Sequence, residues 1–310
     1  MNDSDSPAKA ALPGQIPPGD LCIERANLYI VVVLHDRGIA DSRTCTDLLK
    51  QDCPPRRNAF LLYDNSARSS IQAIPAGWDV HLDPSNGGLS AAYNFAIAQA
   101  KALNCKWVLL LDQDTSLPRN FLSGIHVNLA KMQGHPEVVA IIPIIKAGDR
   151  QVSPLLPKPG RESSFAGRNI VVSEWVTAIN SGTCISVDFI DELGGFSREF
   201  WLDYLDFWLF KMISNSGKCV YVGEMVLEHD LSVANMNRVS IARYRGVLAA
   251  ELRFTNGYLT VPWRLMIVPR LLARAMKHLL FTRDKRLSAS MAMAAVSQIG
   301  HLCRSVRKRR

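Results

Sequence analysis

Two carboxylates separated by one residue follow an apolar run. The stretch WVLLLDQDTSLP covers residues 107–118, and its five apolar residues lead directly into Asp112, Gln113 and Asp114. Like charges this close repel each other, so a cation between them would stabilise the pair. Carboxylate oxygens suit Mg²⁺ or Mn²⁺ and leave coordination positions open for phosphate oxygens. The alternative is an ordinary turn, where Asp is common because it hydrogen-bonds locally.

Other polar groups that could bind a nucleotide or accept a proton follow apolar runs elsewhere in the chain. A carboxylate and an amide such as those of Asp64 and Asn65 could read a nucleobase. Asp203 and Asp206 lie three apart at the predicted start of a helix, where one carboxylate can raise the pKa of the other and make it a general base. The alternative for that pair is that both acids complement the helix dipole. The complete series is Asp64-Asn65-Ser66, Asn86-Gly87-Gly88-Leu89, Asp112-Gln113-Asp114, Asn180-Ser181-Gly182, Gly194-Gly195-Phe196, Trp201 to Asp206 and, last, His229.

The elements that must position these residues alternate between strands and helices. Apolar runs predict strands at 28–34, 59–63, 78–82, 107–111, 138–145, 179–187 and 219–222. Helical spacing predicts helices from residue 86, from Pro118 as a first-turn proline, and over 203–216. Residues 146–168 are rich in Pro, Gly and Ser and predict a loop. This order predicts an α/β fold with a mostly parallel sheet covered on both faces, and ligands bind such sheets at the carboxyl ends of the strands.

Composition limits the class of protein. Of the 310 residues 48% are hydrophobic, which indicates a globular domain with a core. The seven cysteines are scattered without metal-ligand spacing, which favours reduced thiols in a cytosolic protein. Residues 1–27 have the composition of a disordered lead-in and do not resemble a signal peptide. No apolar run is long enough to predict a membrane-spanning helix.

Basic residues are concentrated at the C-terminal end. The net charge is +8, but residues 262–310 carry twelve Lys/Arg and one acid, so the rest of the chain is mildly acidic. Within 261–310 one helical face is apolar (Val268, Leu271, Leu272, Ala275, Met276, Leu279) and the opposite face is basic (Arg270, Arg274, Lys277, His278). The pattern fits a helix lying on an anionic membrane, and it also fits a charged face exposed to water while the apolar face packs on the domain.

The ordered series resembles the family 2 glycosyltransferases, in particular the rhamnosyltransferase-like branch. The segments that carry the resemblance are YDNS, NGGLSAAYN, LLLDQD, SGTCIS, LGGF, WLDYLD and EHDLS, over residues 28–232. The chain departs from the family pattern at His35-Asp36-Arg37, at Trp208 and Met212, and at Ser232. These departures bear on the donor, the acceptor and the support of the base.

The resemblance implies a GT-A fold over residues 28–260, and the residue pattern described above predicts a basic amphipathic helical tail over 261–310. It implies inverting transfer of a sugar from a nucleotide-diphosphate donor, with dTDP-rhamnose favoured, to a glycan or lipid-linked acceptor. The scattered cysteines and the basic tail predict a cytoplasmic location at the inner face of the membrane, and the acidic body predicts no nucleic-acid partner. The residues carried over are Asp64, Asn65, Ser66, Asn86, Gly88, Leu89, Asp112 and Gln113 for the donor; Asp112, Asp114 and His229 for Mg²⁺ or Mn²⁺; Asp206 as base with Asp203; and Gly195, Phe196 and Trp201 on the acceptor side.

Two other function classes are compatible with parts of the sequence. A sugar-nucleotide nucleotidyltransferase would also use an α/β nucleotide domain and Mg²⁺, but no Gly-rich loop bearing Lys or Arg follows the first predicted strand. A non-enzymatic membrane or nucleic-acid binder could be built on the basic tail. The acidic body lacks the basic groove interleaved with aromatic residues that a nucleic acid needs.

Overall fold

The computed structural model describes residues 27–55, 58–159, 161–229, 240–281 and 285–307. The predicted lead-in, apart from Asn27, lies outside these residues, as do Asp230, Leu231 and Ser232 of the EHDLS segment and Lys308 to Arg310.

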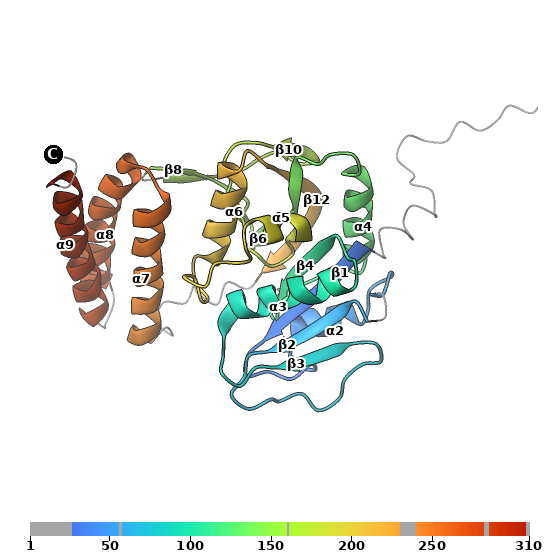
Figure 1. The fold of residues 1–310 in the computed structure, drawn as a ribbon. Helices are drawn as coiled ribbons and strands as arrows, with labels where there is room; N and C mark the ends of the chain where they lie inside the picture. Colours follow the sequence, from blue (N-terminus) through green and yellow to red (C-terminus); the bar gives the residue numbers. More distant parts are fainter. Residues whose placement is uncertain (1–26, 56–57, 160, 230–239, 282–284, 308–310) are drawn as a thin grey trace, which may run out of the picture.

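The centre of the molecule is a ten-stranded sheet (Figure 1). Its path runs β10-β12-β6-β11-β4-β1-β2-β3, and the longer strands run parallel, with β11 antiparallel between β4 and β6. The strands on this path are β1 (Leu28–Leu34), β2 (Phe60–Asp64), β3 (Asp79–Leu82), β4 (Trp107–Asp112), β6 (Val138–Ala147), β10 (Ile170–Val172), β11 (Cys184–Ser186) and β12 (Cys219–His229). Two short strands lie off it: β5 (Thr115–Ser116) pairs with β12, and β7 (Arg150–Ser153) pairs with β6.

Helices cover both faces of this sheet, because its inner strands are apolar on both sides. Alternate residues of β1 belong to different cores: Val31 and Val33 to one, Ile30 and Val32 to the other. The first core is completed by α3 (Gly88–Ala102), α5 (Val187–Glu192) and α6 (Leu205–Asn215), and the second by α2 (Arg43–Leu48) and α4 (Phe121–Lys131). The predicted α/β fold with a mostly parallel sheet and a C-terminal helical extension is confirmed.

The strand order places a crevice between β1 and β4. From β1 the chain builds β2 and β3 on one side, and then returns to place β4 on the other side of β1. Leu34 is in register with Asp64 of β2, and Val33 with Asp112 of β4, so both carboxylates lie at one edge of the sheet. A reversal of strand order of this kind is where open α/β sheets bind ligands.

Several predicted boundaries differ from the structure. Helix α4 begins at Phe121, whose N–H donates to the Pro118 carbonyl, so Pro118 lies in the preceding turn. The predicted loop 146–168 instead contains β7 and a hairpin of β8 (Leu155–Lys158) and β9 (Arg161–Ser164). Strand β12 runs on to His229 because its second half pairs with β6 and β5. Helix α6 begins at Leu205, so Asp203 precedes it.

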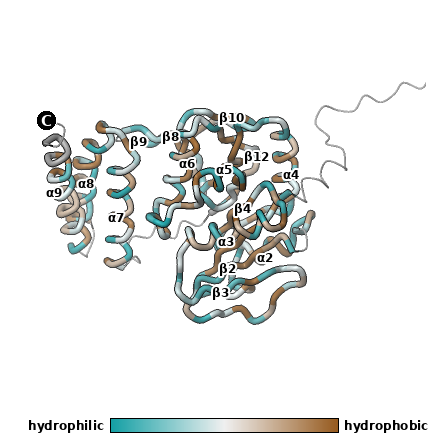
Figure 2. The backbone as a smooth tube through the Cα atoms, in the orientation of Figure 1, coloured by the Kyte–Doolittle hydropathy of each residue, from teal (hydrophilic) through white to brown (hydrophobic). Residues whose placement is uncertain are grey.

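Three helices complete the chain: α7 (Ile241–Tyr258), α8 (Val261–Phe281) and α9 (Lys285–Arg307). They enclose a separate small core, which includes Leu248, Leu271 and Met291. Polar and apolar residues alternate along them (Figure 2). Helix α7 also packs into the main core through Phe254, so the helical extension is joined to the domain before the predicted boundary at residue 260. In the part of the chain that the structure describes, no helix has the length and hydrophobicity to cross a membrane.

Candidate active site

A cleft of about 460 Å³ lies at the edge of the sheet where β1, β2 and β4 end. Its residues come from the strand ends, from the start of α3, from the segment before α6 and from α7. The polar and aromatic ones are His35, Asn65, Asn86, Asp112, Gln113, Asp114, Asn180, Trp201, Asp203, Tyr204, Asp206, Phe207 and Arg243. The cleft therefore brings together residues from several motifs that lie far apart in the sequence, and it adds others, such as Arg243, that no motif singled out.

The Asp112-Gln113-Asp114 turn is fixed by hydroxyl groups from two other segments. Thr44, at the start of α2, donates through its Oγ1 to the Asp112 carbonyl at 2.5 Å. Ser42 donates to the Gln113 carbonyl at 2.8 Å, and the Asp112 N–H donates to Ser181 Oγ at 2.9 Å. These hydrogen bonds hold the backbone of the turn in place, and they thereby preorganise the carboxylates of Asp112 and Asp114.

Two carboxylates fit one mode of divalent-ion binding. Within the described residues, no group of three or more His, Cys, Asp or Glu side chains is placed to hold an ion. Asp112 and Asp114 both line the cleft, and no described residue pairs with the Asp114 carboxylate. Mg²⁺ is usually held by one or two carboxylates together with substrate phosphates and water, so this pair fits that open mode.

His229 was also predicted as a metal ligand. Its backbone pairs with Thr115, which directly follows Asp114. Its side chain is outside what the structure describes, and the role of the imidazole stays a prediction.

The end of β2 carries polar atoms without partners. Asp64 and Asn65 are 1% and 4% exposed, and no described residue donates to Asp64 Oδ2 or pairs with Asn65 Oδ1. The other Asp64 oxygen accepts from the N–H and hydroxyl of Ser66. A buried polar atom without a hydrogen bond costs about 1–3 kcal/mol, so such atoms beside a cleft indicate that a ligand completes them.

The start of α3 is built by close contact with Trp201. Gly88 has a φ of +77°, and a Cβ there would lie 2.3 Å from the Trp201 carbonyl oxygen. The Trp201 indole donates to the Asn86 carbonyl at 2.9 Å. Glycine is therefore required at 88 both for its φ and for space. Leu89 lines the cleft beside it.

Asp206 is a cleft carboxylate with a strongly shifted pKa. Burial raises its pKa to about 7, and the negative charges of Asp112 and Asp203 add to that shift. The Phe207 N–H donates to Asp206 Oδ1 at 2.8 Å. A carboxyl group with a pKa near neutrality can accept a proton from a substrate hydroxyl at physiological pH.

Asp203 is placed differently from its expected role. Both of its carboxylate oxygens accept from the Arg243 guanidinium, one of them at 2.6 Å. It lies outside α6, and its charge still contributes to the raised pKa of Asp206. Asp203 is thus an ion-paired neighbour of the candidate base.

Gly195 and Phe196, predicted on the acceptor side, do not line the cleft. Phe196 is 2% exposed and packs against Tyr93 and Trp208. Its N–H and carbonyl both bond the side chain of Asn94, the last residue of the NGGLSAAYN segment. Gly195 has a φ of +98° and no room for a Cβ beside Asn94. This segment is a structural link between α3 and the loop before α6.

The site also involves Arg243, which carried no distinguishing signal in the sequence, and Tyr93 and Asn180, which belong to motif segments. Arg243 comes from α7, far along the chain from the motifs. Tyr93 is fully buried; burial raises its pKa well above the usual range, and the charges of Asp112 and Asp206 add to this. Asn180 is 4% exposed, and its Oδ1 has no described partner. Asn180 opens the Asn180-Ser181-Gly182 segment of the motif series.

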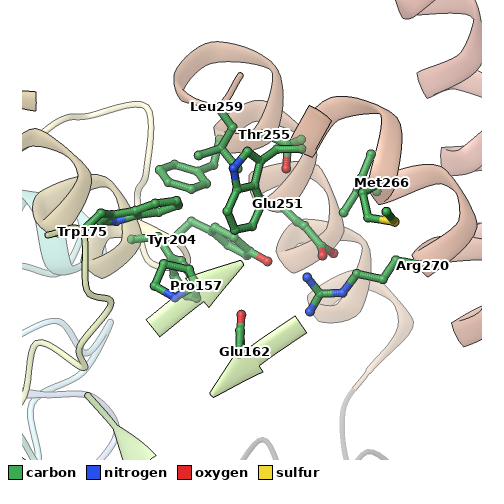
Figure 3. A pocket seen from close by; sticks show the side chains of 13 residues that line it. Pro157, Glu162, Trp175, Tyr204, Glu251, Thr255, Leu259, Met266 and Arg270 are labelled. Atoms are coloured by element: carbon green, nitrogen blue, oxygen red, sulfur yellow. The ribbon is translucent and has the colours of Figure 1, made fainter. Parts of the chain in front are cut away.

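A smaller aromatic pocket adjoins the cleft (Figure 3). Tyr204 and Phe207 line both, and they flank Asp206 in the sequence. Tyr204 has a left-handed backbone (φ 65°, ψ 8°), uncommon for a bulky residue, and its ring stacks on Phe207 at 4.7 Å. Trp175 and Trp263 form an aromatic side of the pocket, and its charged groups are Glu162, Glu251 and Arg270.

No protein-family model matches the chain, and no curated protein matches it. Among solved structures, S. aureus TarS 1–349 aligns at 14% identity and a TM-score of 0.46, over 92% of this chain and 92% of that chain. The mannosyltransferase PcManGT from Pyrobaculum calidifontis, in complex with GDP-Man and Mn²⁺, aligns at 14% identity and a TM-score of 0.47, over 95% and 91%. TM-scores this low establish neither a shared fold family nor a shared reaction, so the site itself must carry the functional argument.

Proposed function

We propose that this chain is an inverting glycosyltransferase of the GT-A fold that transfers a sugar from a nucleotide-diphosphate donor to an acceptor hydroxyl. The observation that carries the proposal is one cleft that contains the Asp112–Asp114 pair and a carboxyl group, Asp206, whose pKa is raised to about 7. A diphosphate donor needs a cation, which the Asp112–Asp114 pair would hold. An acceptor hydroxyl needs a group that takes its proton, which is the proposed role of Asp206. The ordered motif resemblance to family 2 glycosyltransferases agrees with this combination.

The donor would lie along the strand ends. Asp64, Asn65 and Ser66 would bind the base, using the two oxygen atoms that have no described partner. Asp112 and Gln113 would hold the ribose, while Asn86, Gly88 and Leu89 would border the sugar. By resemblance the favoured donor is dTDP-rhamnose.

Asp112 and Asp114, with His229 as the third candidate ligand, would hold Mg²⁺ or Mn²⁺. When bound, the cation supplies Lewis-acid stabilisation of the leaving diphosphate. Asp206 would take the proton of the acceptor hydroxyl as the acceptor oxygen forms its bond to the anomeric carbon. The bond from that carbon to the diphosphate breaks, and the nucleoside diphosphate leaves with the electron pair. A single displacement of this kind inverts the anomeric configuration.

The acceptor would approach from the aromatic pocket. Tyr204 and Phe207 line both this pocket and the cleft, and Asp206 lines the cleft. Aromatic rings offer a flat apolar surface for one face of a sugar ring, while nearby carboxylates such as Glu162 can accept from its hydroxyls. The acceptor would then lie beside Trp175 and Trp263, with Trp201 contributing from the cleft. The acceptor would be a glycan or a lipid-linked glycan.

The proposal is tested by calorimetric titration of the full chain with a panel of nucleoside diphosphates, with and without Mn²⁺. We expect one nucleotide to bind in a Mn²⁺-dependent manner and Asp114→Ala to lose that binding. Asp149→Ala, an exposed carboxylate on the turn between β6 and β7, is the matched control and should bind like the unchanged chain. The absence of Mn²⁺-dependent binding to every nucleotide would reject the proposal. Formation of a nucleotide sugar from a nucleoside triphosphate and a sugar 1-phosphate would replace it with nucleotidyl transfer.

A further inference from the structure

The outward side of α8 is apolar along its whole length. Twelve residues of this helix are exposed, and Lys277 is the one charged residue among them. We define the outer α8 face by Leu265, Leu272, Met276, Leu279 and Leu280, which are 46–65% exposed. Phe281, at the end of the helix, is 80% exposed. Large apolar side chains that recur on one helix face and remain exposed mark an interaction surface.

The outer α8 face is not needed to fold the helical extension. Ile267, Leu271 and Ala275 are the α8 residues that enter the core shared with α7 and α9. The single apolar face predicted from the sequence is therefore divided: Leu271 and Ala275 are inside, whereas Leu272, Met276 and Leu279 face outward. A helix that only packs on its own domain needs one apolar stripe. Helix α8 has a second apolar stripe, the outer α8 face.

The basic face predicted from the sequence is also divided. Arg274 turns inward, and its guanidinium donates to both oxygens of the buried Glu251 at 2.8 Å. Lys277 remains exposed on α8, and Lys285 and Arg286 are exposed at the start of α9. Among the tail's Lys and Arg residues whose side chains the structure describes, the exposed ones therefore lie on the helix that carries the apolar face and at the start of the next one.

Charge decides which partner suits this surface. Residues 261–310 contain twelve Lys/Arg and a single acid, Asp284. A second copy of the chain on the same face would place basic groups opposite basic groups, with one acid per chain to pair them. An anionic lipid surface supplies negative headgroups to the basic residues and an acyl boundary to the apolar ones.

We propose that the outer α8 face docks the chain on an anionic lipid bilayer, with α8 lying in the plane of the surface. Leu272, Met276 and Leu279 enter the boundary between headgroups and acyl chains, and Lys277, Lys285 and Arg286 contact the headgroups. This goes beyond the proposed glycosyl transfer and does not depend on it, because docking is measured without turnover.

The test is cosedimentation of the full chain with phosphatidylcholine vesicles, with and without phosphatidylglycerol. We expect binding to the vesicles that contain phosphatidylglycerol, and a loss of at least about tenfold in affinity for Leu272→Ser/Met276→Ser/Leu279→Ser. The matched control is Leu49→Ser/Ile74→Ser/Leu82→Ser, which changes three residues that are 54–55% exposed on other elements. It should bind like the unchanged chain, and circular dichroism should show that both variants are folded.

Three results would overturn the proposal. The first is no binding of the unchanged chain to either vesicle. The second is equal binding by the α8 variant and the unchanged chain, or equal binding to both vesicle types. The third is a dimer in sedimentation velocity that the α8 variant dissociates while vesicle binding is absent, since the face would then belong to a second copy of the chain.

Discussion

The Arg243 guanidinium donates to both carboxylate oxygens of Asp203, three residues before Asp206. The two acids therefore differ in kind although they are close in sequence. Asp203 is committed to a pair with α7, while Asp206 lies against the cleft with a pKa raised to about 7. Arg243 keeps a second full negative charge from standing uncompensated beside the candidate base.

The first prediction separates these two acids. Asp206→Asn should lower kcat by about 10²–10⁴-fold, because the group that accepts the hydroxyl proton is lost. Asp203→Asn should retain most of the activity and should shift the rising limb of the pH–rate profile to lower pH, because one of the charges that raise the pKa of Asp206 is gone. Steady-state kinetics over a pH series measures both. Equal losses of kcat in the two variants would contradict the assignment of Asp206 as the base.

The second prediction concerns stability. The pKa of Asp206 is raised in the folded state, so folding favours its protonated form. The stabilising effect of the bound proton is present at low pH and is lost as pH rises through about 7. An Asn side chain does not titrate, so the stability of the Asp206→Asn variant does not fall in this way as pH rises. The variant should therefore gain stability relative to the unchanged chain between about pH 5 and pH 8, by roughly 2–4 kcal/mol. Denaturant unfolding at both pH values measures this difference, and a constant difference would refute the raised pKa.

The third prediction concerns the contact between Gly88 and Trp201. Gly88→Ala adds a methyl group where the Trp201 carbonyl oxygen would lie 2.3 Å away, so the segment before α6 must move. We expect a loss of donor affinity as well as of stability. Gly134→Ala is the control, since Gly134 has a similar φ of +80° with open space around it. If both variants lose donor affinity equally, backbone strain alone explains the effect.

The fourth prediction tests the aromatic pocket. Trp263→Ala should raise the KM for the acceptor while donor binding by calorimetry stays unchanged, because Trp263 lines the pocket but not the cleft. Trp78→Ala removes an indole that stacks on Phe60 of β2, away from the pocket, and serves as the control for loss of a tryptophan. An unchanged acceptor KM in Trp263→Ala would move the acceptor elsewhere.

The fifth prediction concerns the buried pair of Glu251 and Arg274. The Glu251 side chain is 7% exposed, and its carboxylate forms an ion pair with Arg274. Arg274→Met should destabilise the fold by about 3–5 kcal/mol, because it leaves an uncompensated buried charge. Adding Glu251→Gln should restore much of that loss. Additive losses in the double variant, measured by denaturant unfolding, would contradict the coupling.

The inner strands of the sheet, such as β1 and β4, could be predicted because each is a short apolar run buried on both faces. The predicted strand 28–34 matches β1 residue for residue, and the predicted strand 107–111 is one residue short of β4. The hairpin β8–β9 could not be predicted, because β8 (LLPK) is interrupted by Pro157, β9 (RESS) is polar, and backbone pairing rather than side-chain pattern defines it.

The candidate site was predictable where side chains follow strand ends directly. Asp112 and Asp64 are of this kind, because the register of parallel strands brings their ends together. Arg243 was not, because it reaches the cleft only through the packing of α7 against the domain. Phe196 carried a motif signal, yet its role is to pack against Tyr93 in the core. A residue in a motif can therefore be required for packing rather than for binding or catalysis.

Helix α8 has one side on the aromatic pocket, through Trp263 and Arg270, and another side, the outer α8 face, turned to solvent. An α-helix with its side chains is about 10–12 Å across. If the outer face rests on lipid, the thickness of this one helix sets the height of the pocket above the bilayer. The distance of the pocket from the bilayer would then select acceptors by length. Acceptors whose reactive hydroxyl lies within the first sugars beyond the lipid would reach the pocket, whereas longer glycans would extend past it.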